Sequence, residues 1–246
     1  MKSKGWLRYF EMNRQDFIEP LWDAPCPLEL EMKARLARSL SHFQLGETGG
    51  GRHLFRTASR QMEDNAAYIG ALRLFVAEEA EHARLLEGLV RRFGGSVITR
   101  HWTHFLFRAA RRALGLNFEI QTLLIAELVG TAYYRLLQRR GRDPILDQVC
   151  LRVLDDEAQH VAFHLDHLRA SHAALLPAER ALWSLQFQVL FSAALWVAWI
   201  DHCAVMESLG ANRGEFFRDA RRECIQFLGK LEVAGAAGLI TMPAAG

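Results

Sequence analysis

Two segments of the 246-residue chain place acidic and histidine side chains in the middle of an apolar helical stripe. Each contains the pattern Glu-x-x-His, formed by Glu79 with His82 and by Glu157 with His160. Three residues cover about 300° of an α-helix, so the two members of each pair lie on one face. An unpaired buried carboxylate is costly, so these groups need partners inside the fold.

Apolar residues at steps of four and three surround both pairs, which argues against a solvated helix face. The first stripe consists of Tyr68, Leu72, Phe75, Glu79, His82, Leu86 and Leu89. The second consists of Leu146, Cys150, Val153, Glu157, His160, His164 and Leu168.

Two further apolar stripes are each interrupted by a single glutamate, Glu47 or Glu127. Glu47 precedes Glu79 by 32 residues and Glu127 precedes Glu157 by 30, so the chain consists of two helical hairpins of similar design. Packing the hairpins together brings four carboxylates and two imidazoles into one place. This set matches a pair of divalent transition metals in charge and hardness.

The arrangement resembles the ferritin-like di-iron carboxylate superfamily, in which two bundle helices each supply one Glu and two others supply Glu-x-x-His. The likeness covers about residues 36–168. It implies a dinuclear site of two iron ions, or of manganese and iron, with O2 as co-substrate and an external electron donor. The metal ligands that it implies are Glu47, Glu79, His82, Glu127, Glu157 and His160.

Five other residues near the motifs have predicted or alternative roles. Glu78 and Asp156 resemble the acidic residues that hydrogen-bond a ligand histidine from a facing helix in this superfamily. His164 shares the face of His160, and is an extra ligand, a proton relay or, the favoured interpretation, a satisfied polar residue at a cavity rim. Thr131 resembles a threonine of some bacterial hydrocarbon monooxygenases, although a helical threonine more often serves packing. Glu119 competes with Glu127 for the ligand role, from nearer the helix start.

The expected fold is all-α, a ferritin-like four-helix bundle with two additional C-terminal helices in a single domain, 1–246. The bundle occupies about residues 28–172, with helices over 28–60, 61–93, 117–140 and 144–172. The additional helices lie within about 178–232, between a lead-in of thirty residues and a loosely ordered tail. Glycines 46 and 49–51 indicate either a distorted turn beside Glu47 or a plain helix break, with both alternatives open.

Residues 181–200 contain no charged side chain and have the length of a membrane span. Polar residues dilute the segment, including Gln186 and Gln188, and Asp201 follows it directly. The sequence therefore favours a helix buried all round over membrane contact. Apolar surface on the last two helices makes a homodimer or packs on the bundle, and both alternatives stay open.

Composition narrows the classes of function. Thirty Lys and Arg against 28 Asp and Glu give a formal charge of +2, so no global field calls for a nucleic-acid partner. The four cysteines contain no CxxC pair, which argues against a zinc or iron–sulfur knot. The amino terminus lacks the apolar run of a signal peptide, so we expect a cytoplasmic protein.

The resemblance implies an O2-activating oxidase or oxygenase, and the charge-free helix favours a small apolar substrate. A ferroxidase or iron-handling protein would use the same ligands in a shorter chain. Arginine-rich stretches would instead suit a phosphate-bearing substrate, as in tRNA hydroxylases of this superfamily. The non-enzyme alternative is a metal-free helical interaction or membrane-associated module.

Overall fold

The structure is a computed structural model that describes residues 2–48, 51–111 and 115–239, and the regular elements of these residues are all helices. In chain order they are α1 (Ser3–Asn13), α2 (Leu30–Glu47), α3 (Gly51–Gln61), α4 (Ala66–Arg92), α5 (Trp102–Arg111), α6 (Leu116–Arg140), α7 (Pro144–Ala173), α8 (Pro177–Ser208) and α9 (Arg213–Leu239). The expected all-α class is confirmed.

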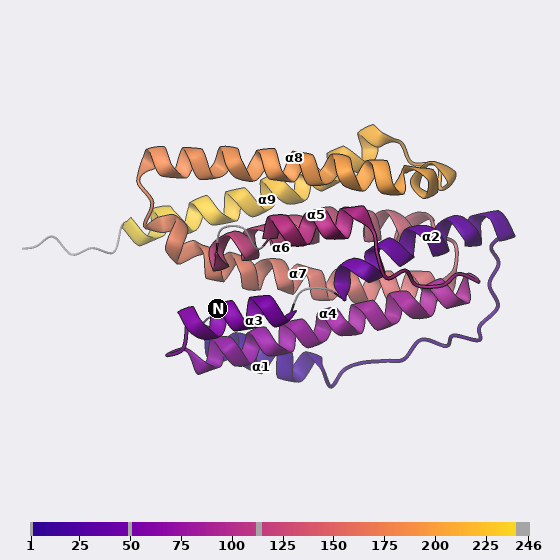
Figure 1. The fold of residues 1–246 in the computed structure, drawn as a ribbon, viewed down its shortest axis with the longest axis horizontal. Coiled ribbons are helices and arrows are strands. Elements are labelled where there is room, and N and C mark those ends of the chain that lie inside the picture. The colour runs from indigo at the N-terminus through magenta and orange to yellow at the C-terminus, as the bar shows by residue number, and fades with distance from the viewer. Residues whose placement is uncertain (1, 49–50, 112–114, 240–246) are drawn as a thin grey trace, which may run out of the picture.

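Two long helical hairpins form the centre of the molecule (Figure 1). Helix α2 packs along α4, α6 packs along α7, and α4 meets α7 between the hairpins. Helices α8 and α9 cover the second hairpin, since both contact α6 and α9 also contacts α7. The expected four-helix bundle with two additional C-terminal helices is therefore present.

The ends of the central helices follow the sequence signals for capping. Asn65 accepts a hydrogen bond from the Tyr68 backbone N–H at 3.0 Å and begins α4. Gly94, just after α4, has φ +77°, a conformation that glycine adopts without strain. Asp143 caps α7 through the backbone N–H of Ile145 and Leu146, with Pro144 in the first turn.

The continuous helix expected over 28–60 is wrong, because α2 ends at Glu47 and α3 begins at Gly51. A Cβ at Gly51 would lie 2.2 Å from the Cγ1 of Val76, so this position needs glycine for the close approach of α3 to α4. Gly49 and Gly50 lie outside the described residues, so the choice between a distorted turn and a plain helix break stays open.

Both ends of the chain contain more helix than expected. Residues 3–13 form α1, which packs on α4 through the buried anchors Trp6 and Phe10. Isolated short helices are marginal, so α1 owes its stability to this packing and not to its own sequence signals. The last helix continues to Leu239, into the segment expected to be loosely ordered.

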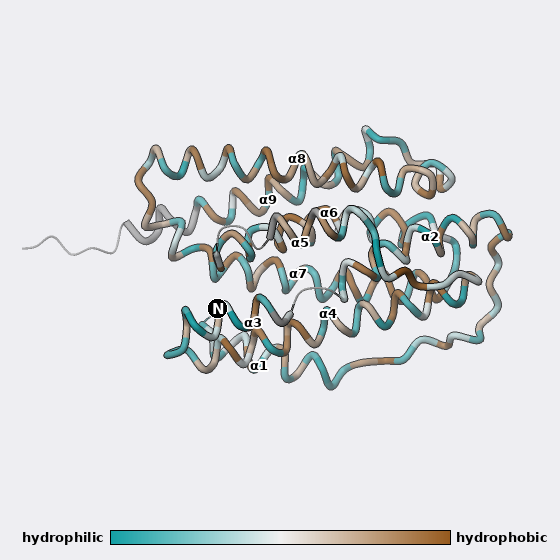
Figure 2. The backbone as a smooth tube through the Cα atoms, in the orientation of Figure 1, coloured by the Kyte–Doolittle hydropathy of each residue, from teal (hydrophilic) through white to brown (hydrophobic). Residues whose placement is uncertain are grey.

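Helix α8 is buried on one face only, which contradicts the expectation of burial all round. Phe187, Phe191 and Leu195 are buried, whereas Leu182 and Leu185 are 67% and 60% exposed. Apolar positions recur along the whole helix in Figure 2. It is long and apolar enough to cross a membrane by length and composition, and 28% of its most apolar window is buried.

Candidate metal centre

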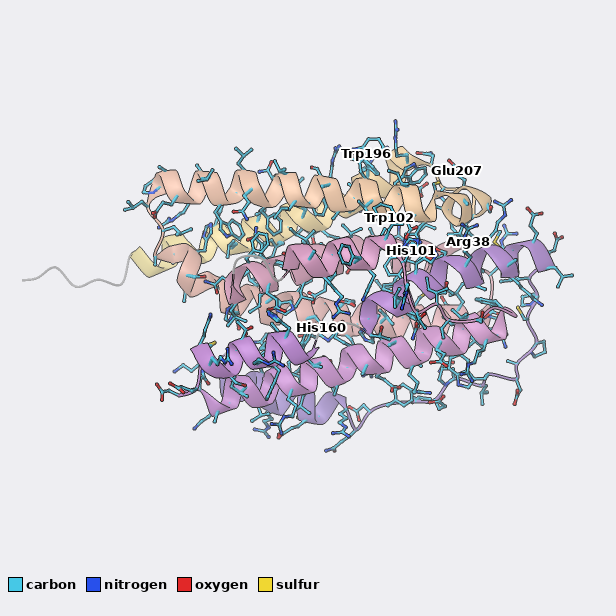
Figure 3. The ribbon with its side chains drawn as sticks, viewed as in Figure 1. Arg38, His101, Trp102, His160, Trp196 and Glu207 are labelled. Carbon is cyan, nitrogen blue, oxygen red and sulfur yellow. The ribbon has the colours of Figure 1, made fainter. Side chains whose placement is uncertain are left out.

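The two Glu-x-x-His pairs face each other across the contact between α4 and α7. One potential ligand atom from each of Glu79, His82, Glu157 and His160 lies within 4.8 Å of the other three. The Nδ1 of His160 is 3.0 Å from Oε1 of Glu79, and the Nδ1 of His82 is 3.6 Å from Oε1 of Glu157. Both imidazoles are fully buried, and Figure 3 shows His160 in the interior of the bundle.

The other nitrogen of each histidine bonds a carboxylate on the opposite helix. His82 Nε2 is 3.1 Å from Oδ2 of Asp156, and His160 Nε2 is 3.0 Å from Oε2 of Glu78. A carboxylate only accepts hydrogen bonds, so each Nε2 carries the proton and donates it. In the neutral ring that a metal ion binds, the lone pair is then on Nδ1, the atom that points toward the glutamates.

Asn13 joins these two outer carboxylates, a role that the sequence reasoning missed. Its Nδ2 lies 2.8 Å from Oε1 of Glu78 and 2.8 Å from Oδ1 of Asp156, so one amide group donates to both. The available signal was spacing, because Trp6, Phe10 and Asn13 follow the same four- and three-residue steps as the other stripes.

Glu47 and Glu127 come from α2 and α6, and each has its own partner. The hydroxyl of Tyr134 donates a hydrogen bond to Oε1 of Glu47 at 3.1 Å. Oε1 of Glu127 lies 2.8 Å from Nε2 of His164. Glu119 lies elsewhere, with Oε2 2.9 Å from Nδ1 of His53, which leaves Glu127 as the glutamate of α6 beside the site.

Neither His164 nor Thr131 is among the residues that line the cavity described below. His164 is fully buried and its Nε2 lies 2.8 Å from Oε1 of Glu127, so it is a satisfied polar residue, as favoured, but one that lies behind the cavity wall. Its contact makes it a positioning group for Glu127. Thr131 is 8% exposed and also does not line the cavity, so its placement favours the packing interpretation.

The electrostatics show how tightly the carboxylates are crowded. Burial raises the pKa of Glu157 to about 7, against the lowering influence of His160. Burial and the charge of Glu79 hold the pKa of Glu47 well above its usual range. Burial would also raise the pKa of Glu79, but hydrogen bonding and charge from His160 lower it to about 2. Protons therefore take up part of the negative charge that two cations would neutralise.

Several buried nitrogen and oxygen atoms at the site are free to act as ligands of a pair of metal ions. His82 Nδ1 and Glu127 Oε2 have no hydrogen-bond partner among the residues that the structure describes. Buried polar atoms without partners are rare, and each calls for an explanation such as an ion. Imidazole nitrogen with carboxylate oxygen is a donor set for divalent iron or manganese, so the residues present fit a dinuclear metal centre.

A cavity of about 780 Å³ adjoins this centre. All four glutamates, Glu47, Glu79, Glu127 and Glu157, line it. Its remaining wall is mainly apolar and includes Phe75 of α4 and Leu190 and Ala194 of α8. Helix α8 thus contributes one side of the apolar cavity beside the carboxylates.

Comparison with solved structures finds a mutant of an R2-like ligand-binding oxidase that holds an aerobically reconstituted Mn/Fe cofactor. The TM-score is 0.58 at 13% sequence identity, over 94% of this chain and 93% of that chain. The chain has the ferritin-like fold. No protein-family model and no curated protein matches the sequence. The ferritin-like bundle is therefore shown by its structure, together with the Glu-His-Glu-His cluster at its centre.

Proposed function

We propose that this ferritin-like protein is an O2-activating oxidase or oxygenase with two iron ions, or one manganese and one iron, and a small apolar substrate. The observation that carries the proposal is the apolar cavity whose wall contains all four glutamates. A bare ferroxidase site needs no such chamber. A cavity lined by apolar side chains also suits a small greasy molecule better than a polynucleotide.

Six residues would hold the metals. They would be the four glutamates Glu47, Glu79, Glu127 and Glu157 together with His82 and His160. When bound, such ions supply the electrons that reduce O2. An external electron donor then returns these electrons to the ions.

The surrounding residues prepare the site. Glu78 and Asp156 orient both imidazoles so that a neutral ring presents the lone pair of Nδ1, because each accepts a hydrogen bond from Nε2. Tyr134 orients Glu47, and His164 orients Glu127. The apolar wall excludes water from the reacting groups and binds the hydrocarbon part of the substrate.

Metal analysis after anaerobic loading with Fe(II) tests the centre. We expect E157A to hold about two metals per chain fewer than the wild type, because the two carboxylate oxygens of Glu157 lie 3.6 Å and 3.5 Å from the Nδ1 atoms of His82 and His160. The matched control is E119Q, which changes a fully buried glutamate paired with His53 outside the site. An unchanged metal content in E157A would show that the cluster is a structural network.

Oxygen uptake by the loaded protein then tests the reaction class. Long-chain aldehydes and quinols are suitable probes, because each offers an apolar body to the cavity. Uptake that depends on such a compound supports an oxidase or oxygenase. Uptake that follows only added Fe(II) would favour the ferroxidase alternative. A cytoplasmic location stays a prediction from the sequence, a homodimer stays an open alternative, and membrane contact stays the less favoured alternative.

A further inference from the structure

A second group of metal-ligating side chains lies outside the dinuclear cluster. His42 comes from α2, His101 from the segment before α5, and Asp201 from α8. Potential ligand atoms of these three residues all lie within 4.8 Å of one another. Figure 3 shows His101 at the start of α5, well separated from His160.

The separations within this group suit a single metal ion. Asp201 Oδ2 is 3.0 Å from His42 Nδ1, and Asp201 Oδ1 is 3.5 Å from His101 Nε2. Ligands about 2.0–2.1 Å from a tetrahedral metal are about 3.4 Å from each other. Small side-chain rotations therefore bring all three donors into a first coordination shell.

One ion pair with Asp201 accounts for only one of the two histidines. The rings of His42 and His101 stack with centroids 4.0 Å apart at 29°, and both approach the same carboxylate. Two protonated rings in this stack would repel each other, and one carboxylate balances only one of them. Burial and the neighbouring His42 lower the pKa of His101, which favours its neutral ring.

A hydrogen-bond contact on the far side of the His101 ring leaves its Nε2 facing Asp201. Nδ1 of His101 is 2.7 Å from Oγ1 of Thr103. With a metal ion on Nε2, a neutral His101 would keep its proton on Nδ1 and donate it to this hydroxyl. A hydrogen bond from the second nitrogen of a ligand histidine is also typical of metal sites.

We propose that His42, His101 and Asp201 bind one divalent first-row transition metal ion, separate from the dinuclear pair. Two imidazoles and one carboxylate form the donor set of open Zn²⁺ and non-haem Fe²⁺ sites. His42 and Asp201 also line the 780 Å³ cavity, so the ion stands at the wall of the chamber that contains the four glutamates. It ties α8 to α2 and to the segment before α5.

Cobalt titration of chelator-stripped protein tests this site. Co²⁺ absorbs in the visible when four- or five-coordinate, so its binding is counted by elemental analysis and followed by spectrum. We expect three cobalt ions per wild-type chain, two in H101A and one in E157A. The matched control is H53A, which removes a different histidine paired with a single carboxylate and leaves the count at three.

The two proposals fail in different ways. A cobalt count that H101A does not change, with two ions lost in E157A, would overturn the mononuclear site alone. A count of one that H101A abolishes and E157A leaves intact would overturn the dinuclear centre alone. Circular dichroism checks that H101A is folded. D201N is the second variant, and it has to lose the same ion for the proposal to stand.

Discussion

Nε2 of His82, on α4, lies 3.1 Å from Oδ2 of Asp156, on α7. The acidic residue that precedes one motif glutamate thus fixes the histidine of the other motif. Asp156 stays ionised, since burial would raise its pKa but His82 and Asn13 lower it through hydrogen bonds. The two hairpins are therefore linked by the groups that prepare the metal ligands.

The substitution D156N should weaken metal binding at the dinuclear centre by about 10–100-fold, because His82 loses its anionic partner. Competition with a chelator measures this affinity. D155N, one residue earlier and exposed, is the control and should bind metal as the wild type does. Equal affinities of D156N and D155N would contradict the positioning role.

The substitution N13A should lower the free energy of unfolding of the metal-free protein by about 1.5–3 kcal/mol, since hydrogen bonds to two charged groups are lost. Urea denaturation provides the measurement. N13D keeps the shape but adds a third negative charge, and should be less stable than N13A. The reverse order would show that Asn13 does not act as a donor to Glu78 and Asp156.

Filling the cavity should stop turnover without removing metal. In A194W an indole occupies space beside Leu190, so substrate-dependent O2 uptake should fall at least about tenfold at unchanged metal content. A181W places the same side chain at an exposed position of α8 and should keep the wild-type rate. Normal uptake in A194W would place the substrate outside this cavity.

The stability of the metal-free protein should depend on His167 in acid. Burial and the charge of His164 lower its pKa from 6.5 to about 4. Between these values the unfolded chain binds a proton that the folded chain does not, so stability falls as pH falls from 6.5 toward 4. One proton accounts for at most about 1.4 kcal/mol per pH unit.

The substitution H167Q keeps a donor for Asn117 Oδ1, which lies 3.0 Å from the histidine Nε2, but removes the titrating group. Urea unfolding at a series of pH values should show that the variant loses less stability than the wild type between pH 6.5 and 4. A constant difference between the two proteins across this range would exclude His167 as the cause.

The residues of the candidate metal site could be predicted from the sequence because the pattern that marks them is local. Glu79 with His82 and Glu157 with His160 interrupt apolar stripes at helical spacing, and this pattern requires no knowledge of the fold. The helix ends at Asp143 and Gly94 could be predicted for the same reason, since capping depends on a few adjacent residues, whereas α4 begins at Ala66 and not at residue 61 as expected. The break between Glu47 and Gly51 was left open, because the glycine requirement arises from Val76 on another helix.

The sequence by itself determined the all-α class, the two hairpins and six candidate ligands, because periodicity and capping act within a few residues along the chain. Only the tertiary structure decided that Asn13 bridges Glu78 and Asp156, and that His42 and His101 meet at Asp201. It also decided that one face of α8 stays exposed while the other lines the cavity. These relationships join residues far apart in sequence, and they are set by how whole helices pack.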